Sequence, residues 1–202
     1  MHCIHISTAY TRTAYFAATL LISSAAFSAS LAAHAQAAAS DDDKHFVEAA
    51  LKGGMSEVEL GQLAVKKGNS EDVKQFGQKM VDDHTALGDK MKTVAGNIGV
   101  TPPSVQSGGG MATQAKLEVL SGDSFDKAYI SAMVKDHEDD LADFKKEAAS
   151  GTSPEVKSAA RQGETVVSHH LMMIKKIAAA HNVSASNRKP SPSVLASVAS
   201  SR

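Results

Sequence analysis

Two five-residue segments with nearly the same sequence interrupt the apolar patterns of this chain. Residues 80–84 read MVDDH and residues 133–137 read MVKDH. Around each segment, apolar residues recur at steps of three and four, the spacing that puts side chains on one face of an α-helix. Each segment therefore places a carboxylate and an imidazole where an apolar stripe should continue. A buried charge without a partner is costly, so these groups are predicted to have partners or a function.

The composition favours a soluble helical protein. The chain has 202 residues, of which 43% are hydrophobic, 21% charged and only 4% aromatic, with no Trp. Ala, Lys, Glu, Asp and Met dominate, and these residues favour helices over sheets. The formal net charge of -1 and the lack of a basic face give no electrostatic case for binding nucleic acid.

The first 37 residues have the features of a secretory signal peptide. Arg12 is the only Lys, Arg, Asp or Glu residue before Asp41, and residues 15–33 are apolar or small. Small residues at the right spacing predict cleavage after about Ala35 or Ala37. An uncleaved membrane anchor is the alternative. After cleavage we expect no membrane span and a location in the periplasm or outside the cell.

The single cysteine, Cys3, lies within this leader. It stands too early for a lipoprotein site, which should follow the apolar stretch. The mature chain is therefore expected to have no thiol, which excludes disulfides, thiolate catalysis and cysteine metal ligands.

Four long helical patterns and one short one follow. Two helix starts are well marked. Ser70 is the predicted N-cap of one helix, and Ser153 is the predicted N-cap of another, whose first residue is Pro154.

The C-terminal tail after the last helical pattern is rich in Ser, Ala and Pro and is predicted to be disordered. The expected bundle domain spans 38–181 and the tail 182–202. The expected helices span about 45–67, 71–95, 111–120, 124–149 and 154–181.

The linker at 96–110 constrains the topology. It contains two adjacent prolines and three consecutive glycines, Gly108 to Gly110, which are predicted to exclude regular structure. Fully extended, it reaches about 50 Å, whereas a 25-residue helix is about 37 Å long. It can therefore cross the whole bundle. This connectivity predicts an all-α, ferritin-like four-helix bundle, with a short helix in the long crossover.

Carboxylates and imidazoles on the inner faces of these helices are the candidate site. The last three long helices each carry a histidine near the apolar stripe, and the first carries two glutamates. Such groups inside a bundle are the ligands of iron or manganese sites, and zinc and copper are also compatible. The candidate metal ligands are Glu57, Glu59, Asp83, His84, His137, Glu138 and His170.

Several of these segments together resemble a bacterial family, the ferritin-like domain of unknown function numbered DUF4142. The resemblance rests on FVEAA at 46–50, GMSEVELG at 54–61 and VKQF at 73–76, followed by MVDDH. FDKAY at 125–129, DHE at 136–138 and the late His170-Leu171 extend it over nearly all of the expected mature fold. It implies an exported ferritin-like bundle and does not imply an activity.

One motif of di-iron ferritins is missing. Those proteins use Glu-x-x-His twice, but Val81, Val134 and Val167 stand three residues before the three histidines. In the family, an acid often precedes the last histidine, where this chain has His169. Within each pair of helices, the number of residues between the connecting turn and a side chain gives its height along the bundle, at about 1.5 Å per residue. By this count His137 and His170 differ in height by about 6 Å, and Glu57 and His84 differ by a similar amount. These offsets weaken the prediction of one closed ligand shell.

Two functions from different classes stay open. In the first, the chain binds a transition metal and serves in envelope or oxidative stress. In the second, it is a non-enzymatic structural or interaction module in which each histidine bonds a neighbouring acid, or lies partly exposed. No catalytic motif is recognisable, and a metal-dependent enzyme is the weakest hypothesis. A homo-oligomer is compatible with the sequence, which identifies no protein partner.

Overall fold

The structure, a computed structural model, describes residues 38–184 and contains no strand within them. The all-α class predicted from the sequence is confirmed. The signal-peptide prediction and most of the predicted tail, residues 185–202, lie outside the described residues. The helices are α1 (Asp41–Lys67), α2 (Glu71–Asn97), α3 (Gly108–Glu118), α4 (Gly122–Ser150) and α5 (Pro154–Ala180).

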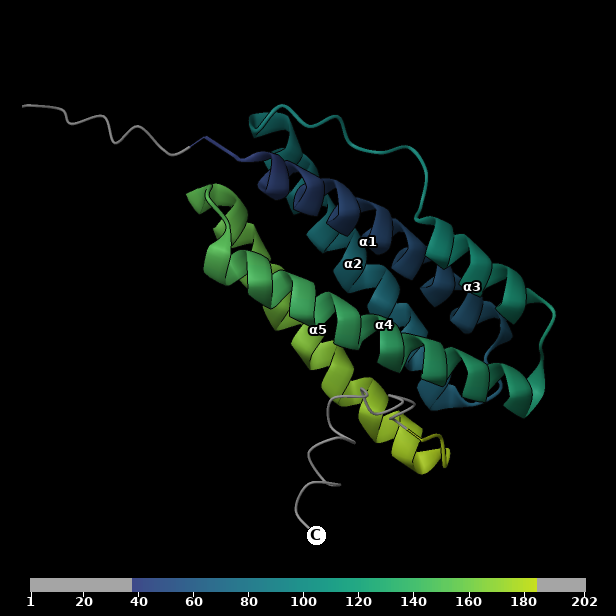
Figure 1. The fold of residues 1–202 in the computed structure, drawn as a ribbon. Coiled ribbons are helices and arrows are strands. Elements are labelled where there is room, and N and C mark those ends of the chain that lie inside the picture. The colour runs from purple at the N-terminus through teal and green to yellow at the C-terminus, as the bar shows by residue number, and fades with distance from the viewer. Residues whose placement is uncertain (1–37, 185–202) are drawn as a thin grey trace, which may run out of the picture. The chain divides into compact units, whose positions relative to one another are not determined.

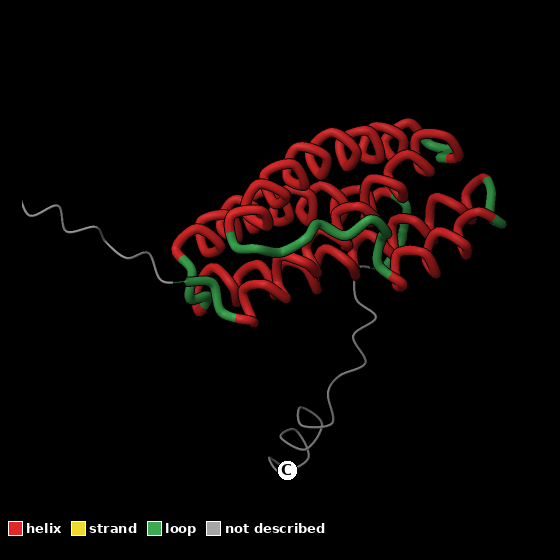
Figure 2. The backbone as a smooth tube through the Cα atoms, turned by 90° about the horizontal axis from the view of Figure 1, so that it is seen from above, coloured by secondary structure: helices red, strands yellow, loops and turns green. Residues whose placement is uncertain are grey.

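The four long helices form two hairpins joined by a crossover. Helix α1 packs along α2, and α4 packs along α5, while α2 contacts α5 and α1 contacts α4 across the bundle (Figure 1). The segment 98–107 runs along the outside of the bundle to reach α3 (Figure 2). This is the predicted ferritin-like connectivity. None of the helices between residues 38 and 184 combines the length and apolar character that a bilayer crossing needs.

Helix α1 begins at Asp41, before the start predicted at His45. The Ser40 hydroxyl accepts a hydrogen bond from the Asp43 backbone N–H, and the Asp43 carboxylate accepts one from the Ser40 backbone N–H. This reciprocal capping box satisfies two N–H groups that the helix itself leaves free. Asp43 also accepts from the N–H groups of Thr152 and Ser153 in the α4–α5 turn. The three aspartates at 41–43 thus form the first turn of α1, and Asp43 anchors this turn to the α4–α5 turn.

The prediction that Gly108 to Gly110 exclude regular structure was wrong. These residues form the first turn of α3, which Ser107 caps through the Gly110 N–H. The Ser107 N–H and hydroxyl also bond Ser56 of α1. A Cβ atom at Gly110 would collide with the Ser56 side chain. Glycine therefore permits the close approach of α3 to α1, and this contact offsets its low helix propensity.

The turn between α1 and α2 is held by a residue from the other hairpin. Ser70 occupies the predicted N-cap position of α2, but its hydroxyl makes no cap bond. Instead, the buried Asp126 carboxylate accepts from the backbone N–H groups of Asn69 and Ser70, both at 2.8 Å. Asp126 therefore has a structural role, because its carboxylate joins the second hairpin to the turn of the first.

The core divides into two apolar clusters at different heights along the bundle. One contains Leu60 of α1, Phe76 of α2, Met133 of α4 and Ile174 of α5. The other lies at the opposite end and includes Val47 of α1, Leu87 of α2, Phe144 of α4 and Val167 of α5. Along every long helix, the residue between its two apolar stretches is polar and buried. These polar residues are Glu57, His84, His137 and His170.

Candidate metal centre

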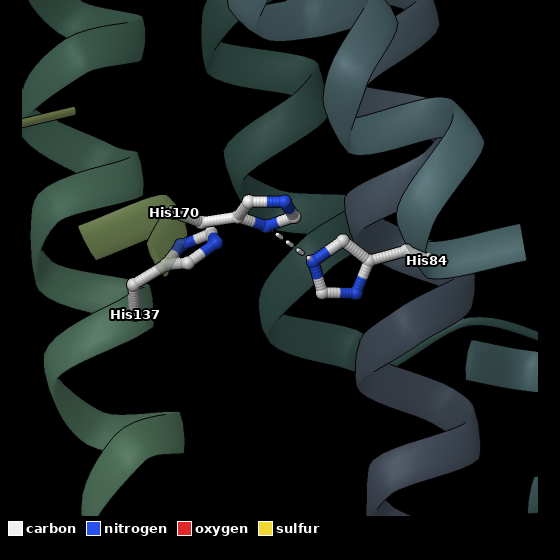
Figure 3. Close-up of side chains that lie close together, drawn as sticks. All are labelled: His84, His137 and His170. Atoms are coloured by element: carbon white, nitrogen blue, oxygen red, sulfur yellow. Dashed lines mark hydrogen bonds between the residues drawn. The ribbon is translucent and has the colours of Figure 1, made fainter. Parts of the chain in front are cut away.

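Each long helix contributes one buried polar side chain to a single layer in the middle of the bundle. Glu57 comes from α1, His84 from α2, His137 from α4 and His170 from α5, and their exposed fractions are at most 2%. The three imidazole rings turn toward one another (Figure 3), with centroids 5.1 to 5.9 Å apart. Flanking apolar residues on each helix hold these polar groups away from solvent.

The outer nitrogen of each imidazole is fixed by a hydrogen-bond acceptor. The Nδ1 atom of His84 lies 2.8 Å from the Oε2 atom of Glu57. The Nδ1 atom of His137 lies 2.9 Å from the Met133 carbonyl oxygen, and the Nε2 atom of His170 lies 2.7 Å from the Oδ2 atom of Asp83. Because these oxygens only accept, each of these ring nitrogens donates. Each ring is thereby locked in one orientation.

The other nitrogen of each ring faces the middle of the layer. The Nε2 atom of His84 and the Nδ1 atom of His170 are 3.2 Å apart, as the dashed line in Figure 3 marks. The three histidines offer ligand atoms that all lie within 4.8 Å of one another. A ligating histidine typically donates its second N–H to a carboxylate or backbone carbonyl, which is the arrangement found here three times.

Without an ion, this arrangement requires one extra proton. His84 donates to Glu57, His170 donates to Asp83, and the contact between the two rings needs a third N–H. Two neutral imidazoles carry only two N–H groups between them. One ring of the pair is therefore an imidazolium, whose positive charge balances the buried Glu57 carboxylate.

The pKa shifts place this charge on His84. Burial lowers its pKa, but the carboxylates of Glu57, Asp83 and Asp136 together outweigh burial and raise the pKa of His84 overall. The pKa of His170 falls to about 4, because of burial first and then the neighbouring positive charge of His84. Burial, again with His84, lowers the pKa of His137. Burial opposes ionisation of Glu57, but His84 keeps the pKa of Glu57 below its ordinary value.

A second pair of atoms in the layer lacks hydrogen bonds. The Nε2 atom of His137 and the Oε1 atom of Glu57 are both buried without a hydrogen-bond partner and lie 3.6 Å apart. With its proton on Nδ1, neutral His137 points a lone pair at the carboxylate. Two ligand atoms on a tetrahedral ion with bonds of about 2.0–2.2 Å lie roughly 3.4 Å apart. The facing atoms therefore fit a shared metal ion.

The remaining predicted ligands lie around this layer or away from it. Asp83 is partly exposed, and it bonds both His170 and Lys79. Glu59 is exposed, and Glu138 pairs with Lys175 at 2.7 Å. Of the two glutamates predicted as ligands on the first long helix, the structure buries only Glu57. His181, at the end of α5, is partly buried and bonds Asp72 of α2.

Acidic residues of α4 surround the Glu57 side of the layer. Asp136 can join Glu57 and His137 as a second group of ligand atoms. Burial, followed by the charge of Glu57, raises the pKa of Asp136 to about 6 and also raises the pKa of Asp140. We did not select Asp136 or Asp140 as ligands from the sequence. Their spacing of four residues, on the face that carries His137, is the signal that could have done so.

Fold and site together define an all-α protein of the ferritin-like class with a buried layer of three histidines and one glutamate. The family described as "Domain of unknown function (DUF4142)" matches residues 28–177. The chain belongs to this family, as its sequence motifs indicated. No curated protein matches the sequence.

Several solved structures share the fold of this chain at low sequence identity. A DUF305 fragment from Deinococcus radiodurans is 16% identical with a TM-score of 0.62, covering 69% of this chain and 97% of its own. A Streptomyces coelicolor protein, provisionally described as a secreted DUF305 protein, is 17% identical with a TM-score of 0.59, covering 70% and 94%. CopM in its Cu(I)-bound form is 16% identical with a TM-score of 0.57, covering 67% and 94%. At these identities the likeness concerns the fold alone.

Proposed function

We propose that this protein binds a transition-metal ion between Glu57, His84, His137 and His170. The observation that carries the proposal is the orientation of the three imidazoles. Each has its outer nitrogen bonded to an acceptor and its inner nitrogen directed at the middle of the layer. The ion would take the place of the extra proton between His84 and His170 and would fill the space between His137 and Glu57.

The ligand set favours some metals over others. Three imidazoles and one carboxylate suit zinc, copper and iron, whereas manganese prefers a site richer in oxygen. The Cu(I)-bound neighbour supports including copper among the ions to test. Four protein ligands would leave no open coordination position, which is typical of structural zinc sites rather than catalytic ones. We therefore propose a binding role for the ion and no catalytic step.

We also propose that the chain is exported to the periplasm or beyond the cell. Support comes from the leader-like sequence of residues 1–37 and from the neighbour provisionally described as secreted. A protein that holds zinc, copper or iron in this compartment would serve in envelope or oxidative stress. Detection of the chain starting near Gln36 or Ala38 in the periplasm or the medium tests the proposal. Retention of the leader on a membrane-bound chain contradicts it.

A metal-free structural layer is the second candidate. The run of bonds from Glu57 through His84 and His170 to Asp83 and Lys79 connects these groups without an ion. In this interpretation the polar layer only specifies how the helices pack, and the protein acts through its surface. The unpaired atoms of His137 and Glu57 argue against it, because buried polar groups are normally bonded.

Elemental analysis distinguishes the two candidates. The untagged protein starting at Ala38 is dialysed separately against zinc, copper, iron and manganese, and the bound metal is counted. We expect about one equivalent of zinc or copper, as one four-ligand site predicts. His84→Ala, His137→Ala and His170→Ala should each lose it.

His169→Ala is the matched control, because His169 neighbours His170 but is exposed. It should retain the wild-type amount of metal, and circular dichroism should show that every variant is helical. Absence of bound metal from the wild-type protein rejects the metal proposal and leaves the structural layer. Equal loss of metal in His169→Ala places the ion on surface histidines and rejects the centre.

A further inference from the structure

A small cavity leads to the polar layer from one side of the bundle. It has a volume of about 80 Å³ and is bounded by α1, α2 and α4. The polar residues in its wall are Glu57, His84, Asp140 and Asp143, and none is Lys or Arg. The rest of the wall is apolar or glycine. A cation in this cavity therefore meets only carboxylates and an imidazole.

The carboxylates of this cavity differ in depth. Asp143 is exposed, Asp140 is partly buried and Glu57 is 2% exposed. Asp140 and Asp143 are three residues apart on α4 and therefore lie on the same side of that helix. The buried Oε1 atom of Glu57, at the deep end, has no hydrogen-bond partner. Carboxyl groups thus extend from solvent to an atom that lacks a partner. Burial and then the charge of Glu57 raise the pKa of Asp140 to about 9, so Asp143 supplies the negative charge at the entrance, and Asp140 releases its proton when it meets a cation.

Three glycines leave the α1 and α2 walls of the cavity open. Gly53 and Gly54 of α1 and Gly88 of α2 line the cavity, and a Cβ atom at any of them would meet nothing within 4 Å. Glycine inside a helix costs about 0.5–1 kcal/mol relative to alanine. Packing does not require glycine at these three positions. Keeping the wall of the cavity open is a physical reason for its presence there.

We propose that Asp143 and Asp140 form the access route by which a divalent cation passes from solvent to Glu57 and His84. This inference rests on the proposed metal centre and adds the residues that deliver the ion. Asp143 would attract the hydrated ion, and Asp140 would replace part of its water shell. Carboxylate oxygens exchange with water on hard and borderline cations, so the ion can move inward step by step.

A second approach to His84 exists and differs in chemistry. A groove of about 490 Å³ under the crossover also reaches His84, but its wall is mostly apolar, and the one carboxylate in it, Glu59, is matched by Lys92. The groove therefore offers a cation no net negative charge. Gly53 lines only the acidic cavity, whereas Val58 lines only the groove. Substitutions at these two positions can therefore separate the two routes.

Zinc loading kinetics test the proposal. Metal-free wild-type protein is mixed with Zn²⁺ in a stopped-flow instrument, and a zinc-responsive dye follows the free ion. The double variant Asp140→Asn, Asp143→Asn should load roughly tenfold more slowly, at the lower end of electrostatic steering effects. Its zinc content at equilibrium should match the wild type. The wild-type rate should fall with added salt more steeply than the rate of the variant.

Two matched controls accompany the double variant. Asp139→Asn changes the same kind of charge on the same helix, but Asp139 pairs with Lys135 and does not line the cavity. It should load at the wild-type rate. Gly53→Leu should slow loading by narrowing the cavity, and Val58→Leu should not. Circular dichroism identifies any variant that fails to fold.

The outcomes separate this inference from the proposed function. If the wild-type protein binds no zinc, copper or iron, both are rejected. If it binds zinc and the double variant loads as fast as Asp139→Asn, the centre stands and the route is rejected. Loss of zinc at equilibrium in the double variant with an unchanged loading rate also overturns the route, because Asp140 would then be a ligand. Slow loading in Val58→Leu with normal loading in Gly53→Leu assigns access to the groove and rejects the acidic route.

Discussion

The Nε2 atom of His137 faces the Oε1 atom of Glu57 at 3.6 Å, and neither atom has a hydrogen-bond partner. Both atoms are buried, and both present lone pairs when His137 is neutral. Such a contact is unfavourable unless a cation or a proton lies between them. This unpaired contact distinguishes the layer from a buried polar network in which every group has a hydrogen-bond partner within the protein.

Removal of the negative charge at Glu57 should destabilise the metal-free bundle. Glu57→Gln keeps the shape but leaves the buried His84 without its counter-charge, at a cost of about 2–4 kcal/mol in the free energy of unfolding. Urea denaturation followed by circular dichroism measures the change. Glu59→Gln, two residues away and exposed, should stay within about 0.5 kcal/mol of the wild type. Equal effects of the two substitutions would contradict the assigned roles.

Asp83 should set the orientation of His170 and thereby the affinity for metal. Asp83→Asn weakens the hydrogen bond to the Nε2 atom of His170, and loss of such an orienting partner typically costs 10–100-fold in affinity. Competition titration with a zinc chelator measures it. Asp82→Asn is the matched control, since Asp82 is exposed and bonds only Gln78 among the hydrogen bonds found. An unchanged affinity in Asp83→Asn would remove Asp83 from the centre.

Glu147 should make stability depend on pH near neutrality. Burial and then the adjacent Asp43 raise its pKa from 4.5 to about 7, with a smaller contribution from Asp42 and an opposing one from Lys146. The folded state therefore holds a proton that the unfolded state has lost. This stabilisation is complete below about pH 4.5 and disappears as pH rises through about 7.

Thermal denaturation between pH 4.5 and 8 measures this effect. The melting temperature of the wild type should fall across that range, and Glu147→Gln should flatten the fall. Asp43 has its pKa lowered to about 2, because hydrogen bonds from Glu147, Ser40 and Thr152 outweigh burial. Its contribution is lost only in acid below about pH 4, so it does not obscure the test. An equally steep fall in Glu147→Gln would refute the assignment.

Gly163 should not tolerate a larger side chain. A Cβ atom at this position of α5 would collide with the ring of Phe144 on α4, which is buried in the core. Gly163→Ala should therefore destabilise the protein by about 1–3 kcal/mol, despite the better helix propensity of alanine. Gly96→Ala in α2 meets nothing within 4 Å and should be neutral or stabilising. Denaturant titration compares the two, and a stable Gly163→Ala protein would show that α4 and α5 can move apart.

The sequence predicted the helix order and the crossover because their signals are local. The apolar periodicity predicted the helices, and Ser153 and Pro154 predicted the start of α5, which the structure places at Pro154. Two boundaries were misplaced because tertiary contacts determine them. Helix α1 begins early where Asp43 holds the α4–α5 turn, and α3 begins on glycines where Gly110 contacts Ser56. Neither contact can be read from residues near in sequence.

The candidate residues could be predicted, but their meeting in one layer could not. Counting residues from the turns separated His137 and His170 by about 6 Å along the axis, yet their ring centroids lie 5.6 Å apart in total. Side chains on a helix lean toward its N-terminus. His137 therefore leans away from the α4–α5 turn and His170 leans toward it, which reduces the offset. The same reasoning brings Glu57 to the height of His84.

The four groups of the layer are divided equally between the two hairpins. Glu57 and His84 belong to the first hairpin, and His137 and His170 belong to the second. Either hairpin alone offers two ligands, too few for tight binding, so an ion would bind only after the hairpins dock. Such an ion adds to the stability of the docked form, by about 2.7 kcal/mol at a hundredfold excess over its dissociation constant. Metal supply and assembly of the bundle would then be thermodynamically coupled, and the amount of folded protein would report the availability of the ion.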